Sequence, residues 1–446
     1  MKPLPWHYAS CLLTVVILVA VLPHVARGMT ERDKAPSAAG ALHPTDTGPR
    51  LSLAALINEL ESANPEIKAA RQRWEAAQAV VPQVQTLPDP KLQFGYQRMP
   101  MQPPAVQGAM YGFGQEIPFP GKLKLKGEVA QREAERLEQE FQAVRLRLLA
   151  GVKEAYFALH FVHKSMEIVE RNKALLIQFE KTAKARYSVG QAAQQDVFRA
   201  QVEISRVLDR LAVLEQRKES LHAAINRLLN RPPIDPLGTP EEIQVPLLTQ
   251  SLPELTKRAE NFSPVLLASA KGIARSEQAV SLARKQFFPD FDVTALGLRN
   301  DLINDNGYQV MVGIKIPLFY ESKQRQGVKE AVASLNGARE ELTAARQEIL
   351  FQVKDAFVQT QRAERLITIL RDALIPQSTL ALQAAQVSYS IGKVDFLTLL
   401  NSLLTLQENQ LELHGEMVAH EQAIARLEAL TGGPVRGPAP EASPHP

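Results

Sequence analysis

The stretch YSVGQAAQQD at 187–196 returns in shortened form as YSIGKVD at 389–395. In both places a tyrosine, a serine, a β-branched residue and a glycine lie between two long segments with helical periodicity. A glycine directly after a helix can take a positive φ and end the helix in a tight turn. The two stretches therefore predict two sharp helix reversals, at the same position in two halves of one chain.

An internal duplication underlies this recurrence and extends over most of the chain. VKEAYFAL at 152–159 matches VKDAFVQT at 353–360, and FGQEIPFPGK at 113–122 matches VGIKIPLFYESK at 312–323. A spacing of about 200 residues indicates two copies of one structural unit rather than a short-repeat solenoid. The prolines of RPPIDPLGTPEE, which lies between the copies, cannot continue a helix.

The duplication sets the expected domain boundaries. Each repeat is predicted to contain a helix, a β-hairpin, a very long helix, a tip and a second helix. The repeats span 51–230 and 251–432 around a linker at 231–250, with hairpins at 88–119 and 287–319 and tips at 187–195 and 389–395.

The helical prediction depends on heptad spacing. Apolar residues recur in alternating steps of three and four, which is the pattern of coiled-coil packing. The long helix expected from about 124 to 187 would extend roughly 95 Å, which no compact domain could hold. The predicted core positions after the first turn are Val197, Ala200, Ile204, Val207, Leu211, Leu214, Lys218, Leu221, Ile225 and Leu228. Those after the second turn are Leu399, Leu403, Leu406, Gln410, Leu413, Met417, His420, Ile424 and Leu427.

The hairpins show period-two alternation. The run YQVMVGIKIPL at 308–318 alternates apolar and other residues over a length that a tilted transmembrane strand needs. A half-buried soluble sheet alternates equally well. Four strands cannot close on themselves, and lipid does not tolerate an open edge, so strands that cross a membrane must come from several chains. The residues expected to face lipid are Leu92, Phe94, Tyr96, Val310, Val312 and Ile314.

The ends of the chain differ from its body. Lys2, an apolar run and the triplet Ala26–Gly28 predict a secretory signal peptide at 1–28, with an uncleaved anchor helix as the alternative. The single cysteine, Cys11, lies in that signal, so we expect no disulfide. Residues 29–50 and 433–446 have the composition of flexible flanks. The net charge of +3 gives no electrostatic case for nucleic acid.

The chain resembles the TolC-like outer-membrane factors. The resemblance is carried by the duplication, the element order, the proline-containing segments EIPFPGK and KIPLF, and the two YS(V/I)G turns. The resemblance covers about 51–432 and implies a mainly α fold, a trimeric α-helical barrel joined to a shared 12-stranded β-barrel. Within the family, LPDPKLQFGYQRMP and GQEIPFPGKLKLKGEVA look most like the CzcC and CusC heavy-metal branch. CusC-like members carry a lipidated N-terminal cysteine, which this chain lacks.

The resemblance also implies partners and sites. It implies a homotrimer in the outer membrane of a Gram-negative bacterium, a periplasmic adaptor, an inner-membrane RND pump, and no enzymatic activity. Adaptor docking would involve Tyr187, Gly190, Tyr389 and Gly392. The family's tunnel-entrance carboxylates lie six and nine positions beyond the second glycine, which here are Thr398 and Asn401. Either Asp395, three positions beyond that glycine, replaces the family's carboxylates, or neutral hydrogen bonds form the gate. In the first tip, Asp196 lies six positions beyond Gly190, as in the family.

Other candidate residues have simpler explanations. His160 and His163 lie three apart on a helix and could share a metal, but no third ligand is evident. His420 fits a packed or polar core position. Met99, Met101 and Met110 suggest soft-metal binding, although strand or loop packing explains them better. We therefore expect no metal site and no cofactor.

The leading functional hypothesis is a passive exit duct for heavy-metal cations. The alternative within the same fold is the exit duct of a drug efflux or type I protein secretion system. A soluble periplasmic coiled-coil adaptor is the alternative of another class, although adaptors usually have one helical hairpin and this chain predicts two.

Overall fold

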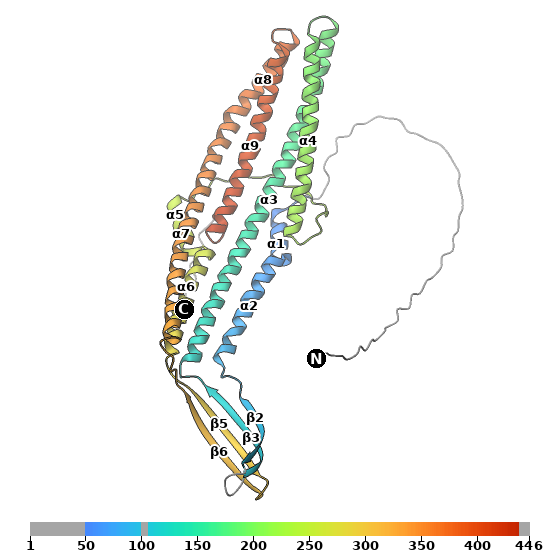
Figure 1. Ribbon diagram of the computed structural model, residues 1–446. Coiled ribbons are helices and arrows are strands. Elements are labelled where there is room, and N and C mark those ends of the chain that lie inside the picture. The colour runs from blue at the N-terminus through green and yellow to red at the C-terminus, as the bar shows by residue number, and fades with distance from the viewer. Residues whose placement is uncertain (1–49, 100–105, 437–446) are drawn as a thin grey trace, which may run out of the picture. The chain divides into compact units, whose positions relative to one another are not determined.

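Long helices lie alongside one another, and a four-stranded sheet extends from one end of them (Figure 1). This is a computed structural model, and it describes residues 50–99 and 106–436. The helices are α1 Leu53–Ala63, α2 Pro65–Gln85, α3 Lys122–Ser188, α4 Gln194–Leu228, α5 Leu252–Phe262, α6 Pro264–Lys285, α7 Gln324–Ile369, α8 Ile375–Ser390 and α9 Phe396–Leu430. A π-helical turn, η1, spans Leu370–Leu374. The strands are β1 Arg50–Leu51, β2 Lys91–Met99, β3 Val106–Ile117, β4 Thr239–Pro240, β5 Asp290–Asn300 and β6 Asp305–Lys315.

Helix α3 confirms the expected long helix and has 67 residues, which corresponds to roughly 100 Å. The first helix of each repeat, predicted to be a single helix, is broken in two. Both breaks precede a proline, since the residue before proline is driven out of the helical region. At the first break the Asn64 side chain accepts hydrogen bonds from the N–H groups of Glu66 and Ile67 and donates one to the Leu228 carbonyl.

Six of the ten predicted core positions of α4 are buried, and Ile204, Leu211, Lys218 and Leu221 are partly buried. Val197, Ala200, Val207 and Leu214 are buried in a cluster with residues of α3, α8 and α9. The prediction for α9 holds near the tip but is wrong in the middle of the helix. There Gln410, Leu413 and Met417 are only partly buried, and the buried residues are Gln407, Leu411 and Val418. The contact stripe shifts because α9 packs against α8 near the tip and against α3 and α7 beyond it.

Two expected flexible segments are partly structured. Arg50 faces Thr239 in a two-residue parallel pairing between β1 and β4, so the linker contains a short strand. The expected tail at 433–446 begins as packed chain: Val435 is buried beside α5 and α7, and Arg436 pairs with Glu421. The expected signal peptide at 1–28, residues 29–49 and the tail from 437 onward lie outside the described residues.

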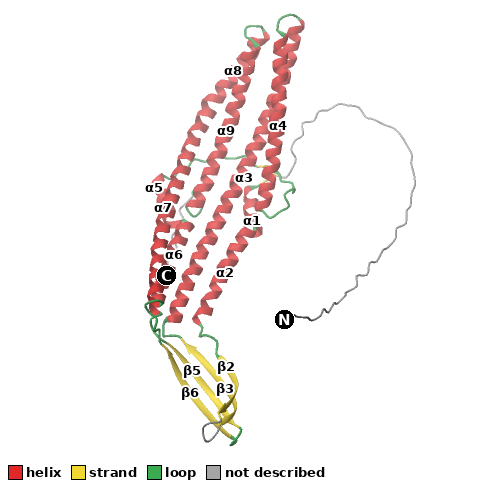
Figure 2. Cartoon of the chain, viewed as in Figure 1, coloured by secondary structure: helices red, strands yellow, loops and turns green. Residues whose placement is uncertain are grey.

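The sheet is antiparallel throughout, in the order β2-β3-β5-β6 (Figure 2). Strand β6 ends at Lys315, so Ile316 and Leu318 lie beyond it and do not continue the alternation as expected. Pro317, between them, has no N–H to donate to a neighbouring strand. Among the described residues, no helix is long and apolar enough to cross a membrane.

Candidate functional site

The two tips share one backbone geometry. Gly190 and Gly392 have φ values of 71° and 76°. In the first tip the N–H of Gly190 donates to the Tyr187 carbonyl and that of Gln191 to the Arg186 carbonyl. In the second tip Gly392 donates to Tyr389 and Lys393 to Ser388. This pair of bonds is a Schellman motif, in which the glycine satisfies the last carbonyls of the helix.

The surroundings of the two tips differ. The side chain of Tyr187 is 46% exposed, whereas that of Tyr389 is 3% exposed. Tyr389 packs edge-on against Phe396, and the guanidinium of Arg186 lies 4.9 Å above its ring. Arg186 also donates to the Tyr389 carbonyl and to the Gln191 carbonyl. Arg186 therefore connects the first tip to the second, and the residue at its place in the second repeat is Ser388, which cannot do the same.

The candidate gate residues take two different roles. Asp395 is the N-cap of α9, where its carboxylate accepts bonds from the N–H and hydroxyl of Thr398. These bonds lower the pKa of the Asp395 carboxyl. Burial raises the pKa of Asp196; Arg199 and Arg186 oppose this rise and Asp395 adds to it. The structure thus brings Asp196 and Asp395 within electrostatic reach of each other.

Sequence reasoning found the tip glycines, tyrosines and acids but missed Arg186 and Arg199. Thr398 is tied to Asp395 by the cap, while Asn401 is exposed on the second turn of α9. One sequence feature pointed to Arg186: the residue before the tyrosine is Arg186 in the first turn and Ser388 in the second, although the two turns are otherwise similar. A mismatch indicates different roles for the two tips, but it does not say which partner the arginine contacts.

One face of the sheet carries its aromatic side chains and most of its β-branched ones. Cross-strand partners share a face, and Phe94 faces Tyr111, Tyr111 faces Gly297, and Gly297 faces Tyr308. This face holds all six residues that the sequence analysis expected to meet lipid, and all six are exposed. The opposite face carries charged, amide and glycine positions together with the apolar residues Met110, Leu296, Leu298 and Met311. The apolar residues of the first face are Leu92, Phe94, Tyr96, Ala109, Tyr111, Phe113, Ile117, Phe291, Val293, Ala295, Tyr308, Val310, Val312 and Ile314.

The histidines form structural contacts. His420 is fully buried, with Nδ1 3.1 Å from Glu421 and Nε2 3.3 Å from Glu364. This confirms the expected polar core position. His160 is buried on α3, with Nδ1 3.0 Å from the Glu241 carbonyl. In the part of the chain that the structure describes, no group of three or more His, Cys, Asp or Glu residues is placed to hold a metal.

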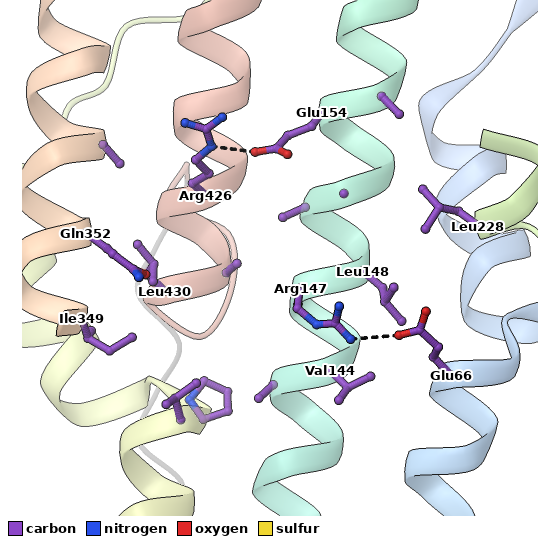
Figure 3. A pocket seen from close by; sticks show the side chains of 18 of the residues that line it. Glu66, Val144, Arg147, Leu148, Glu154, Leu228, Ile349, Gln352, Arg426 and Leu430 are labelled. Carbon is purple, nitrogen blue, oxygen red and sulfur yellow. Dashed lines mark hydrogen bonds and ion pairs between the residues drawn. The ribbon is translucent and has the colours of Figure 1, made fainter. Parts of the chain in front are cut away.

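A hollow of about 970 Å³ lies among the helices (Figure 3). Helix α3 lines it with small residues, and ion pairs cross it from Arg147 to Glu66 and from Arg426 to Glu154. These charges satisfy one another, so the hollow does not present a free charged group for a ligand at those positions. Met110 contributes to strand packing, since a side chain at Gly95 would contact its Cε; Met101 lies outside the described residues.

The comparisons with known proteins agree with this geometry. The model of the outer membrane efflux protein family matches residues 56–231 and 255–433, one match for each repeat. The cobalt-zinc-cadmium resistance protein CzcC of Cupriavidus metallidurans is 21% identical, over 87% of this chain and 92% of its own length. The outer membrane protein TolC of Vibrio cholerae is 22% identical over 85% and 90%. The crystal structure of CusC superposes with a TM-score of 0.73 at 16% identity, covering 89% of this chain and 99% of CusC.

The two family matches together span most of the chain and coincide with the duplication. They exclude the soluble adaptor hypothesis, because the matched family consists of channels rather than adaptors or enzymes. Channels of this kind form trimers and extend from the outer membrane into the periplasm. The chain belongs to the outer membrane efflux protein family and is the outer-membrane exit duct of a tripartite efflux system.

Proposed function

We propose that this duct exports heavy-metal cations supplied by an inner-membrane RND pump through a periplasmic adaptor. The observation that carries the proposal is the likeness to CzcC, a cobalt-zinc-cadmium resistance protein, over nearly the full length of both chains. The sheet, the tips and their carboxylates supply the parts that such a duct needs.

The apolar face of the sheet is proposed to meet lipid. Leu92, Phe94 and Tyr96 lie on one edge strand, and Val310, Val312 and Ile314 lie on the other. Strands of 9 to 12 residues have the length needed to cross a bilayer at a tilt. The opposite face, with Asp292, Gln309 and Lys315 among its residues, suits a water-filled interior.

The tips are proposed to dock the adaptor. Tyr187 and the β-branched residues beside both glycines are exposed, with Val189 67% and Ile391 61% accessible. Gly190 and Gly392 set the turns that present these side chains. The buried Tyr389 is proposed to support the second tip rather than to contact the adaptor itself.

The gate is proposed to consist of Asp196, Asp395, Thr398 and Asn401. Asp196 and Asp395 influence each other electrostatically, and Arg186 ties the second tip to the first. In a symmetric assembly each carboxylate occurs once per copy around the same entrance. A ring of carboxylates at a pore favours the entry of cations over anions.

A deletion strain tests the proposed substrate class. We expect loss of the gene to lower the growth-inhibiting concentrations of Co²⁺, Zn²⁺ and Cd²⁺, and the wild-type gene to restore them. The control is a panel of a dye, a detergent and an antibiotic. Sensitivity confined to that panel would favour a drug duct, and loss of a secreted protein would favour type I secretion.

A further inference from the structure

We infer that the two open edges of the sheet pair between neighbouring copies in one defined register, with Val312 opposite Phe94 of the next copy. The inference rests on the proposed function, since it concerns how several copies close the membrane part of the duct. It goes beyond that function because it assigns the residue pairs and an ion pair of the interface.

The edges are unpaired in one copy. Strands β2 and β6 are the outer strands of the order β2-β3-β5-β6, so each has one row of N–H and C=O groups without a strand partner in the sheet. Such groups are unfavourable in lipid unless they are hydrogen-bonded. A second copy of the same sheet offers the complementary edge.

The duplication supplies the register. Within the chain, Gly114 of β3 faces Lys91, and Gly313 of β6 faces Asp292. The matching segments FGQEIP and VGIKIP place Gly114 and Gly313 at equivalent positions. Lys91 is then equivalent to Asp292. The same spacing makes Pro88 equivalent to Pro289 and Asp89 equivalent to Asp290. Each of these pairs is identical in residue type, which independently supports the alignment of the two repeats.

The contact between the repeats then predicts the contact between copies. Strands β3 and β5 pair with Gly114 opposite Thr294. The equivalent of Gly114 is Gly313 and that of Thr294 is Gln93, so Gly313 should face Gln93 of the neighbouring copy. This register also pairs Gln309 with Gln97, Val310 with Tyr96, Val312 with Phe94 and Ile314 with Leu92.

The pairing continues the apolar face without interruption. The three apolar residues that β2 places on this face, Leu92, Phe94 and Tyr96, meet apolar residues of β6, and this match was not used to set the register. A shift of one residue would turn one strand's apolar side chains to the opposite face. A shift of two residues would leave the apolar side chains of both strands on the same face. The β6–β2 register would then no longer match the register of β3 with β5.

The joint between sheet and helices supports the same arrangement. Within the chain, Nζ of Lys122 lies 2.8 Å from the Asp290 carboxylate, and Phe119 stacks on Phe288 at 4.6 Å. The equivalents of Lys122 and Asp290 are Lys323 and Asp89. Both are exposed, and neither has an ion-pair partner within residues 50–99 and 106–436. We expect Lys323 to pair with Asp89 of the neighbouring copy.

Cysteine cross-linking tests the register, because Cys11 is the only native cysteine and lies in the expected signal peptide. In outer membranes treated with a mild oxidant, Gln97→Cys combined with Gln309→Cys should give disulfide-linked oligomers. The matched control combines Gln93→Cys with Gln309→Cys. It uses the same substitutions on the same face, but the thiols would be displaced by about 13 Å along the strand. A disulfide requires Cβ atoms about 3.5–4.5 Å apart.

Cross-linking of the control pair, without cross-linking of Gln97→Cys to Gln309→Cys, would contradict the register. It would not contradict the proposed function. An oligomer that stays assembled but links neither pair would also overturn the register. A protein that remains monomeric in the membrane extract would contradict the proposed function as well.

Charge exchange tests the joint. We expect Lys323→Glu and Asp89→Lys each to lower the temperature at which the oligomer dissociates in detergent. The double variant should recover most of that loss. Equal destabilisation in the double variant and the single variants would exclude the ion pair. Glu321→Lys, which changes an exposed charge that pairs with Arg325 on the same chain, is the control.

Discussion

At the residue scale, Arg186 forms hydrogen bonds that connect the two tips of one chain. Its guanidinium donates to carbonyls of both tips and lies over a buried aromatic ring. Hydrogen bonds from a charged donor contribute about 1.5–3 kcal/mol each. The observed arrangement of the second tip should therefore depend on this side chain.

Arg186→Ala should loosen the second tip and raise the open fraction of the channel. Loss of one charge-assisted bond corresponds to about a tenfold change in the closed-to-open ratio. Single-channel recording in planar bilayers measures this fraction. Arg206→Ala is the matched control, because Arg206 is exposed on α4 and pairs within its own helix. Equal open fractions in the two variants would contradict the role of Arg186.

The carboxylates of the tips should lose their charge in two steps. Because its folded-state pKa is raised, Asp196 protonates at a higher pH than an unfolded-chain aspartate, for which the value is about 3.9. Folding therefore becomes more favourable at this site as the pH falls through the raised pKa. Asp395 behaves in the opposite way: its contribution is present above the unfolded value and is lost as the pH falls through its lowered pKa.

We expect cation selectivity to decline on acidification in a first step that depends on Asp196. Reversal potentials recorded across a salt gradient at stepped pH measure this decline. Asp196→Asn should remove the first step, whereas Asp209→Asn, at an exposed position farther along α4, should retain it. A pH profile unchanged in the Asp196 variant would show that its carboxylate does not face the ion path.

At the element scale, the two long helices of the repeats are not equivalent. Helix α3 runs without interruption, whereas its counterpart contains the π-turn η1 between α7 and α8. Pro376 lies two residues after the end of this turn and has no N–H for the carbonyl four residues earlier, while its ring would press against that carbonyl. The wider turn accommodates the ring, and π-turns often occur at functional sites.

The π-turn should be the point at which the second hairpin flexes. We expect amide hydrogen exchange to be faster at 370–376 than in the middle of α3, since these hydrogen bonds are weaker. Peptide-resolved exchange on the purified oligomer measures both segments. Pro376→Ala should slow exchange at 370–376 towards the α3 rate. Equal protection of the two segments in the native chain would contradict a hinge there.

Heptad spacing predicted most buried positions of α4 because α3 is the main helix partner of α4. It failed in α9, where the neighbours change along the helix and the buried stripe moves to Gln407 and Leu411. Alternation predicted the apolar face of the sheet, since period two is fixed by strand geometry. Arg186 escaped prediction because its contact joins residues 203 positions apart, which no local pattern encodes.

At the scale of the whole molecule, the duplication explains both the likeness and the differences of the two halves. The pairing of β3 with β5 joins the repeats within a chain, and the pairing of β6 with β2 would join copies by the same geometry. The two halves differ at the tips, at η1 and in the packing of α4 and α9. One helical hairpin is continuous, and the other contains the π-turn and has its tip hydrogen-bonded to Arg186.

The most direct test of the account is single-channel current from the oligomer extracted from outer membranes and inserted into a planar bilayer under a salt gradient. The account predicts discrete current steps with a reversal potential on the cation-selective side. An assembled oligomer that passes no ions, or one that prefers anions, would contradict it.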